Sequence, residues 1–224
     1  MSIPVAIAPL LEGKKGLIVG IANDQSIAWG CARAFRALGA ELAITYLNEK
    51  AKRFVEPLAK EAEAPIFMPL DVKVPGQTEA VFDRIKKQWG AMDFLIHSIA
   101  FSPKEALHGR VVDVSLEGFT STMEVSCWSF LRMAHLAEPL MKKGGSMFAM
   151  SYYGSERVVK NYNIMGVAMA VSVGYANSAN VRSKSGFFGR AVLAGNSIEH
   201  AFFCSRFAMA EINRASPLSE AIPD

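Results

Sequence analysis

The stretch "NYNIMGVAMA", residues 161 to 170, holds Tyr162 and Met169 seven residues apart. At about 3.6 residues per helical turn, this spacing places both side chains on one face of a helix. A tyrosine hydroxyl can hydrogen-bond a carbonyl oxygen on which negative charge develops, and a lysine two turns away would add a positive charge beside it. Met169 cannot do so, because a thioether carries neither a charge nor a donor hydrogen. On local sequence alone, packing is the favoured role for Tyr162 and for the nearby Tyr152 and Tyr153.

A glycine turn in "VGIANDQSIAWG", residues 19 to 30, is the first candidate for nucleotide binding. Gly20 allows a sharp turn and lets a ligand approach the backbone. Ser26 is placed to cap a helix whose free N–H groups and positive dipole end suit a pyrophosphate. The glycines do not have the G-x-G-x-x-G spacing, so this stretch alone is equally consistent with an ordinary turn capped by serine.

Three further strand-like runs end in residues that could line a nucleotide site. The second run ends "TYLNEK", where Leu47 and Asn48 offer neither an acid for the adenosine ribose nor an arginine for a 2′-phosphate, which favours NADH over NADPH. Asp71 in "LDV" can accept a hydrogen bond from an adenine amine, or simply cap the chain after a strand. The run "DFLIHSIAFSP" ends where a nicotinamide and ribose pocket is expected, at the carboxyl ends of the strands. Its candidate lining residues are Ser98, Ile99 and Ala100.

Apolar runs alternate with helix-periodic segments through the first two-thirds of the chain. Strands are predicted at 16–22, 40–46, 64–72, 93–100 and 145–151, and helices at 26–38, near 49–62, near 77–89 and around 117–141. Because the strands are apolar nearly throughout, this pattern predicts an α/β fold: a doubly wound, Rossmann-like parallel sheet with helices on both faces. After about residue 170 neither period is sustained, so the last strands are left open, with a possible helix at 200–212.

Composition limits the classes of partner. The 224 residues are predicted to form one dinucleotide-binding domain, 1–224, with an atypical segment at 171–224. Lys and Arg number 24 against 21 Asp and Glu, a balance that argues against nucleic acid or an anionic membrane as the main partner. Three scattered cysteines favour a reducing cytoplasm, four dispersed histidines predict no metal site, and we expect no signal peptide.

Taken together, these stretches resemble the enoyl-[acyl-carrier-protein] reductases, a divergent branch of the short-chain dehydrogenase/reductase superfamily. The matching elements are "GLIVGIANDQSIAWG", "GAELAITYLNEK", "LDV", "DFLIHSIAFSP" and "SYYGSERVVKNYNIMG", in order, over about residues 11–167. The resemblance implies NADH-dependent reduction of the trans-2 double bond of an acyl thioester carried on acyl carrier protein, as part of fatty acid biosynthesis. It also implies a homotetramer.

The resemblance assigns roles residue by residue. Tyr162 corresponds to the tyrosine that binds the thioester carbonyl, and Tyr152 to a second tyrosine on the substrate side. The positions implied to contact the cofactor are Gly20, Ser26, Ile27, Asp71, Val72, Ser98, Ile99 and Tyr162. The family lysine, which holds the nicotinamide ribose, falls on Met169. Lys160 lies seven residues after Tyr153 but matches a loop position of the family.

The chain departs from the family pattern after Tyr162, where the expected loop over the cofactor, substrate-covering segment and last strand are not recognised in residues 171–224. The first hypothesis is therefore an enoyl reductase by descent whose activity is impaired. The alternative is a catalytically inactive dinucleotide-binding or interaction protein of the same fold. A ketone-reducing short-chain dehydrogenase is disfavoured, because position 166, where its Tyr-x-x-x-Lys pairing needs lysine, is glycine.

Overall fold

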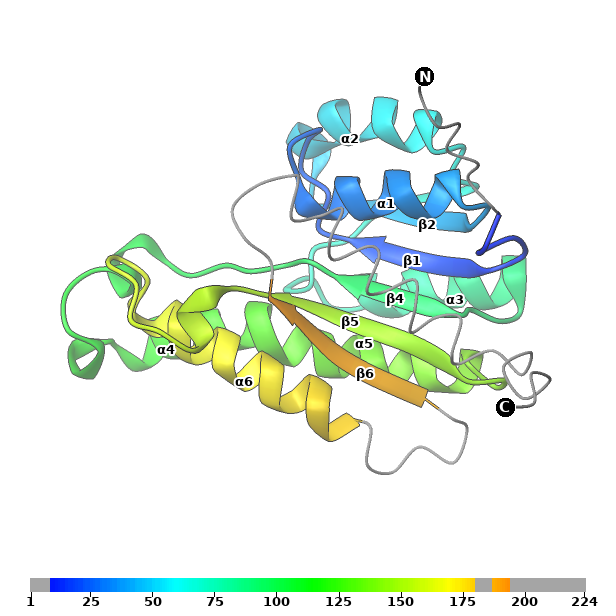
Figure 1. Cartoon of the computed structure of the whole chain (residues 1–224). Helices are drawn as coiled ribbons and strands as arrows, with labels where there is room; N and C mark the ends of the chain where they lie inside the picture. The colour runs from blue at the N-terminus through cyan, green and yellow to red at the C-terminus, as the bar shows by residue number, and fades with distance from the viewer. Residues whose placement is uncertain (1–8, 180–186, 194–224) are drawn as a thin grey trace, which may run out of the picture.

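Six parallel strands form the central sheet of the computed structural model, which describes residues 9–179 and 187–193 (Figure 1). Their bounds are β1 Lys15–Val19, β2 Glu41–Tyr46, β3 Ile66–Pro69, β4 Phe94–His97, β5 Gly145–Ser151 and β6 Phe187–Leu193. The spatial order is β3-β2-β1-β4-β5-β6, so the chain proceeds outward to β3 and then returns to the other side of β1. This reversal between β1 and β4 is the topological switch point of a doubly wound fold. The predicted fold class is confirmed.

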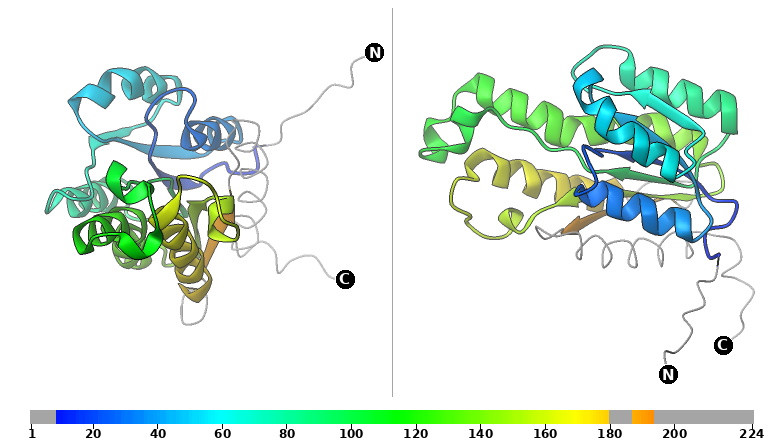
Figure 2. Two further views of the ribbon diagram at one scale, coloured as in Figure 1. Left: turned by 90° about the vertical axis from the view of Figure 1, so that its left-hand side faces the viewer. Right: turned by 90° about the horizontal axis from the view of Figure 1, so that it is seen from above.

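Helices cover both faces of the sheet (Figures 1 and 2). Their bounds are α1 Ile27–Ala37, α2 Glu49–Glu61, α3 Gln77–Trp89, α4 Leu116–Met123, α5 Ser129–Ala137 and α6 Asn163–Ala179. Successive strand residues point to opposite faces. Ile18 and Ile96 therefore pack in the core under α1 and α2, and their neighbours Leu17 and Leu95 pack in the core under α3 and α5. Burial on both faces explains why these strands are apolar nearly throughout.

The helix predicted over 117–141 is interrupted. It consists of α4, a π-helical turn at Glu124–Trp128, α5, and a 3₁₀ turn at Glu138–Leu140. A π-helical turn adds one residue to a helical turn, a difference too small to change the apolar periodicity of a long helix. The sequence pattern therefore predicted the helix but not this local change.

In the described part of the C-terminal segment, where the sequence pattern left the last strands open, regular structure continues past residue 170. Helix α6 continues to Ala179, and β6 pairs in parallel with β5 along its whole length. Ala168, Ser172 and Ala176 recur every four residues in α6 and are all buried. Such small residues give little apolar periodicity, and α6 is stabilised by the close packing that they permit. The helix predicted at 200–212 lies outside the described residues, and the single-domain organisation remains a prediction.

Candidate active site

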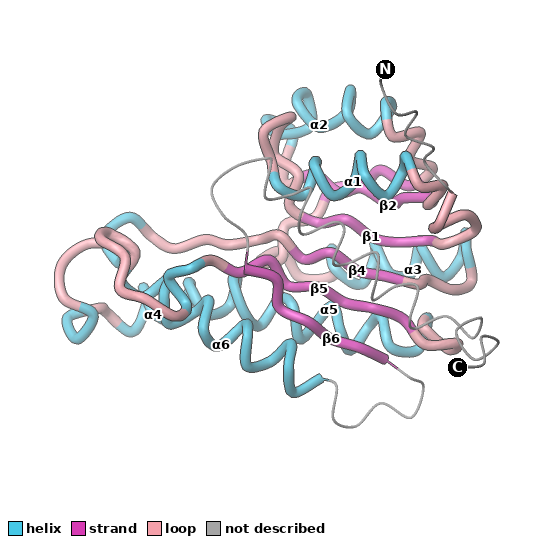
Figure 3. The backbone as a smooth tube through the Cα atoms, in the orientation of Figure 1, coloured by secondary structure: helices cyan, strands magenta, loops and turns pink. Residues whose placement is uncertain are grey.

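Two adjoining cavities lie at the carboxyl ends of the strands, and the connections after β4 and β5 extend from this same end (Figure 3). The Asp71 groove, of about 460 Å³, is lined by residues that follow β1 to β4, among them Gly20, Leu47, Asp71, Val72 and Lys73. The Tyr162 cavity, of about 390 Å³, is lined by Ile27, Met150, Ser151, Tyr152, Val159, Tyr162 and Met169. Ser98, Ile99 and Ala100 line both. The structure thus brings most of the predicted site residues to one place, at the switch point.

Gly20 is the point of closest approach between the first turn and the wall that the two cavities share. Its φ angle is +105°, in the region that favours glycine. A Cβ atom built on Gly20 would stand 1.9 Å from the carbonyl oxygen of Ser98. The turn after β1 therefore requires glycine, and its bare backbone forms one side of the Asp71 groove.

The side chain of Ser26 does not cap α1, contrary to prediction. Its Oγ accepts hydrogen bonds from the backbone N–H groups of Ala22 and Asn23, both at 3.0 Å. A serine hydroxyl can close a local turn as readily as it caps a helix, and here the turn after β1 brings those donors closer. Within the described residues the first amides of α1, those of Ile27 and Ala28, have no acceptor. These free N–H groups suit an anion such as a pyrophosphate.

Asp71 lies in the groove as predicted, with one of its carboxylate oxygens already engaged. Its Oδ1 accepts from the backbone N–H of Lys73 at 2.9 Å, which fixes the carboxylate at the rim and leaves Oδ2 for a ligand amine. At the end of β2, Leu47 lines the groove and is 53% exposed. Asn48 instead caps α2, because its Oδ1 accepts from the Ala51 amide at 3.0 Å.

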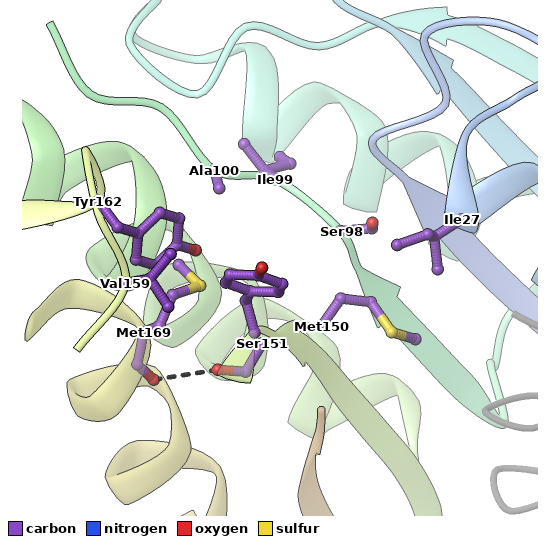
Figure 4. Close-up of a pocket in the computed structure, with 10 residues that line it drawn as sticks. Ile27, Ser98, Ile99, Ala100, Met150, Ser151, Val159, Tyr162 and Met169 are labelled. Atoms are coloured by element: carbon purple, nitrogen blue, oxygen red, sulfur yellow. Dashed lines mark hydrogen bonds between the residues drawn. The ribbon is translucent and has the colours of Figure 1, made fainter. Parts of the chain in front are cut away.

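Tyr162 and Met169 line the same cavity, on the same side of it (Figure 4). The rings of Tyr162 and Tyr152 meet edge to face with centroids 5.0 Å apart. Burial, with a smaller contribution from Tyr152, raises the pKa of Tyr162 to about 12. The phenol therefore stays protonated near neutral pH and can donate a hydrogen bond. Met169 is only 2% exposed, and no charged side chain lines this cavity in the described part of the chain.

The alternative pair, Tyr153 and Lys160, lies outside the Tyr162 cavity. Tyr153 is 53% exposed. Lys160 is exposed too and lines a neighbouring cavity of about 610 Å³, which Val159 and Tyr162 also line. That this pair does not replace the missing lysine stays a prediction. Another candidate cation, Lys184, lies outside the described residues.

Two glycines fix the ring of Tyr162 and exclude a lysine at position 166. A Cβ on Gly154 would stand 2.4 Å from Cδ1 of Tyr162, and a Cβ on Gly166 would stand 2.8 Å from the Gly154 carbonyl oxygen. A longer side chain at 166 would displace this backbone. The structure therefore disfavours the ketone-reducing alternative for a steric reason as well.

Several lining residues were not predicted from the sequence. Met150 and Ser151 end β5, the neighbour of β4, so the rule that ligands bind at the strand ends could have found them. Val159 lies in the loop before Tyr162. Val125 reaches the Asp71 groove from the π-helical turn, which no sequence signal indicated.

Behind the shared wall, His97 ends β4 as a buried, neutral side chain. Its Nε2 lies 2.7 Å from Oγ of Ser129, whose hydroxyl donates its hydrogen to the Val125 carbonyl oxygen at 2.6 Å. The imidazole must therefore donate from Nε2. Burial lowers the pKa of His97 from 6.5 to about 4. His97 helps to hold the π-helical turn against β4.

His97 should make the folded state sensitive to acid. Between pH 6.5 and 4 the unfolded chain binds a proton at this imidazole and the folded chain does not, so stability falls as the pH falls through that window. At about 1.4 kcal/mol per pKa unit, the loss between pH 7.5 and 5 is roughly 2 kcal/mol. Urea unfolding at the two pH values would measure it. His97→Gln keeps an N–H donor but does not titrate, so its free energy of unfolding should fall less between pH 7.5 and pH 5. An equal fall in both proteins would contradict the role assigned to His97.

The described residues hold no group of three or more His, Cys, Asp or Glu side chains placed to bind a metal ion. No helix among them is long and apolar enough to cross a membrane.

Comparison with known proteins gives one family. The family model for enoyl-(acyl carrier protein) reductase matches residues 20–182, which extends past residue 167, where the motif resemblance ended. A curated relative, enoyl-[acyl-carrier-protein] reductase [NADH] 2 of Rhizobium meliloti, is 44% identical over 189 residues, covering 84% of this chain and 69% of the relative. The enoyl-[acyl-carrier-protein] reductase [NADH] FabI of Rickettsia conorii is 48% identical over 72% of this chain and 62% of its own length. The chain thus spans only about two-thirds of these relatives.

Solved structures agree with the curated relatives. The enoyl-(acyl-carrier-protein) reductase of Anaplasma phagocytophilum, in complex with NAD, matches with a TM-score of 0.80 and 44% identity, over 84% of this chain and 72% of that one. The NADH enoyl-[acyl-carrier-protein] reductase of Aquifex aeolicus matches with a TM-score of 0.83 and 31% identity, over 95% and 93%. Together with the family model and the strand-end site, these matches show that the chain belongs to the enoyl-[acyl-carrier-protein] reductase family.

Proposed function

We propose that this chain binds NADH and reduces the trans-2 double bond of an acyl thioester carried on acyl carrier protein, at a rate limited by Met169. The observation that carries the proposal is the placement of Tyr162. Its protonated hydroxyl belongs to a cavity that shares a wall with the groove at the switch point. A donor for the thioester oxygen and a place for the dinucleotide are thus adjacent.

Features of the Asp71 groove fit a dinucleotide. The bare backbone at Gly20 leaves no side chain between the turn and a ligand, and the free amides of Ile27 and Ala28 suit its pyrophosphate. The second carboxylate oxygen of Asp71 suits the adenine amine. We assign Ser26 to the same site because its hydroxyl bonds the backbone of the turn after β1. We assign Val72 to it because Val72 lines the groove.

The chemistry divides between the cofactor and the chain. NADH supplies a hydride for the β-carbon of the enoyl thioester. As electrons move toward the thioester oxygen, the Tyr162 hydroxyl donates a hydrogen bond to it and stabilises the enolate. A proton then adds to the α-carbon, so each turnover consumes one NADH and one proton. Tyr152 supports the ring of Tyr162 from the substrate side. Met169 supplies no charge, and among the described residues no charged side chain lines this cavity.

The direct test is NADH consumption with crotonyl thioester. We expect slow turnover by the natural chain and a further loss in Tyr162→Phe, which keeps the ring but removes the donor. Turnover that does not change in Tyr162→Phe would reject the assigned role.

NADH should bind more tightly than NADPH. Leu47 cannot pair with a 2′-phosphate, and the Asn48 side chain is occupied as a helix cap. Titration of nucleotide fluorescence measures both affinities. Leu47→Arg, which offers a guanidinium at the end of β2, should reduce the difference between the affinities for NADH and NADPH. Preference of the unmodified chain for NADPH would overturn the cofactor assignment.

A second candidate function is dinucleotide binding without catalysis, favoured by the buried thioether of Met169 in the Tyr162 cavity. It predicts that the natural chain binds NADH but does not consume it when crotonyl thioester is present. Measurable consumption by the natural chain would exclude this candidate.

We also propose a homotetramer, in line with the family resemblance, and a cytoplasmic location, in line with the three scattered cysteines. Light scattering of the purified protein tests the tetramer, and cell fractionation tests the compartment.

A further inference from the structure

The segment 98–101 includes the wall common to the Asp71 groove and the Tyr162 cavity: Ser98, Ile99 and Ala100 line both, and Phe101 lines the groove alone. Within the described residues, hydrogen bonds hold its backbone only at the two ends. The N–H of Ser98 donates to the Val19 carbonyl at 3.0 Å, and Phe101 is bound by Ser126. The position of the wall therefore depends on Ser126 at one end, as it depends on β1 at the other.

Ser126 engages both backbone groups of Phe101. Its Oγ accepts from the Phe101 N–H and donates to the Phe101 carbonyl oxygen, each at 3.1 Å. Ser126 is only 1% exposed, so water cannot easily take its place. Removing the hydroxyl would leave a donor and an acceptor without partners in a partly buried place.

The same residue is tied to the helix that carries Met169. The Ser126 carbonyl oxygen accepts from Oγ of Ser172 at 3.0 Å, and the next residue, Cys127, donates from Sγ to the Ala168 carbonyl oxygen at 3.0 Å. Ser172 and Ala168 both belong to α6. The π-helical turn thus joins the shared wall on one side to α6 on the other.

We propose that Ser126 is a positioning residue for the dinucleotide. It holds the segment 98–101, and with it the wall beside the groove assigned to NADH, in place without itself lining either cavity. This inference rests on the proposed function for its ligand, but the position of the wall can be measured without one.

The experiment compares Ser126→Ala with Ser172→Ala as a matched control. Both remove a buried serine hydroxyl next to the π-helical turn, but only the first releases Phe101. NADH affinity is measured by fluorescence titration, and the amide exchange of residues 99–101 by hydrogen exchange without ligand. We expect Ser126→Ala to raise the Kd for NADH about tenfold, the equivalent of one lost hydrogen bond, and to speed exchange in this segment. Ser172→Ala should change the Kd less than about twofold, and Ser126→Cys, which keeps a weak donor and acceptor, should recover part of the affinity.

Equal Kd values in the two alanine variants, or unchanged exchange at 99–101 in Ser126→Ala, would overturn the proposal. If the natural chain binds no NADH, the proposed function fails by itself. If amide exchange at 99–101 is then faster in Ser126→Ala alone, the result would still support the role of Ser126 in positioning the wall. Equal exchange rates in Ser126→Ala and Ser172→Ala would reject that role.

Discussion

Replacing Met169 with lysine is expected to raise the rate of NADH-dependent reduction of crotonyl thioester by about 100-fold. A charged contact to a developing oxyanion is typically worth on the order of 10²-fold or more in rate. Met169 lines the cavity that holds Tyr162, and no cation lines it among the residues described. A lysine here would place an ammonium group beside the tyrosine hydroxyl.

The burial of Met169 determines the pH range in which the Met169→Lys variant should reduce the substrate faster. Met169 is 2% exposed and packs with Cys127, Met165 and Ala168. Burial of an ammonium group lowers its pKa and destabilises the fold. The gain in rate should therefore be largest below the lysine's lowered pKa and fade as the pH rises through it. The pH profile of NADH consumption would separate this effect from a change in packing.

Met169→Gln is the matched control, since it has a similar size and is polar but uncharged. It should raise the rate little. A similar gain from glutamine and lysine would mean that charge is not the missing element. Rapid turnover by the unmodified chain would mean that another group, such as Lys160 or Lys184, supplies the charge, and no gain from lysine would place the main defect in residues 171–224.

Gly20→Ala is expected to abolish measurable NADH binding and to lower the free energy of unfolding by roughly 2–6 kcal/mol. The methyl group would overlap the Ser98 carbonyl oxygen, and φ at this position is +105°. Backbone strain of this kind costs about 1–3 kcal/mol, and overpacking a close contact costs about as much again. Relief of the overlap would push the shared wall into the space assigned to the dinucleotide.

Gly76→Ala separates strain from collision. Gly76 also has a positive φ, +85°, but a Cβ there meets nothing within 4 Å, and it does not line either cavity. Gly76→Ala should lower the free energy of unfolding only by the cost of backbone strain, and it should keep its NADH affinity. Urea unfolding and fluorescence titration of both variants provide the comparison; equal losses of affinity would contradict the steric argument for Gly20.

Much of the fold could be predicted from the sequence, because the signals involved are local and repeated. Apolar runs at 16–22 and 93–100 predicted strands buried on both faces, and the structure has β1 and β4 there. Once parallel strands are expected, residues at their carboxyl ends must lie at one edge of the sheet. That rule placed Asp71 and Ser98 in one groove. Tyr162 and Met169 line one cavity, but not as two positions on one helix face, because Tyr162 lies in the turn before α6, which begins at Asn163.

What the tertiary structure decided concerns single side chains and weakly patterned segments. The Ser26 hydroxyl had two possible sets of donors, and the folded turn brought Ala22 and Asn23 closer than the start of α1. Ser126 bonds the backbone of Phe101 from within a π-helical turn, and an extra residue in one turn does not alter a periodic pattern. Helix α6 and strand β6 depend on packing and pairing with distant elements rather than on their own periodicity. Periodicity records which residues are buried, whereas the partner of a given polar group is determined by competition among all the groups that folding brings together.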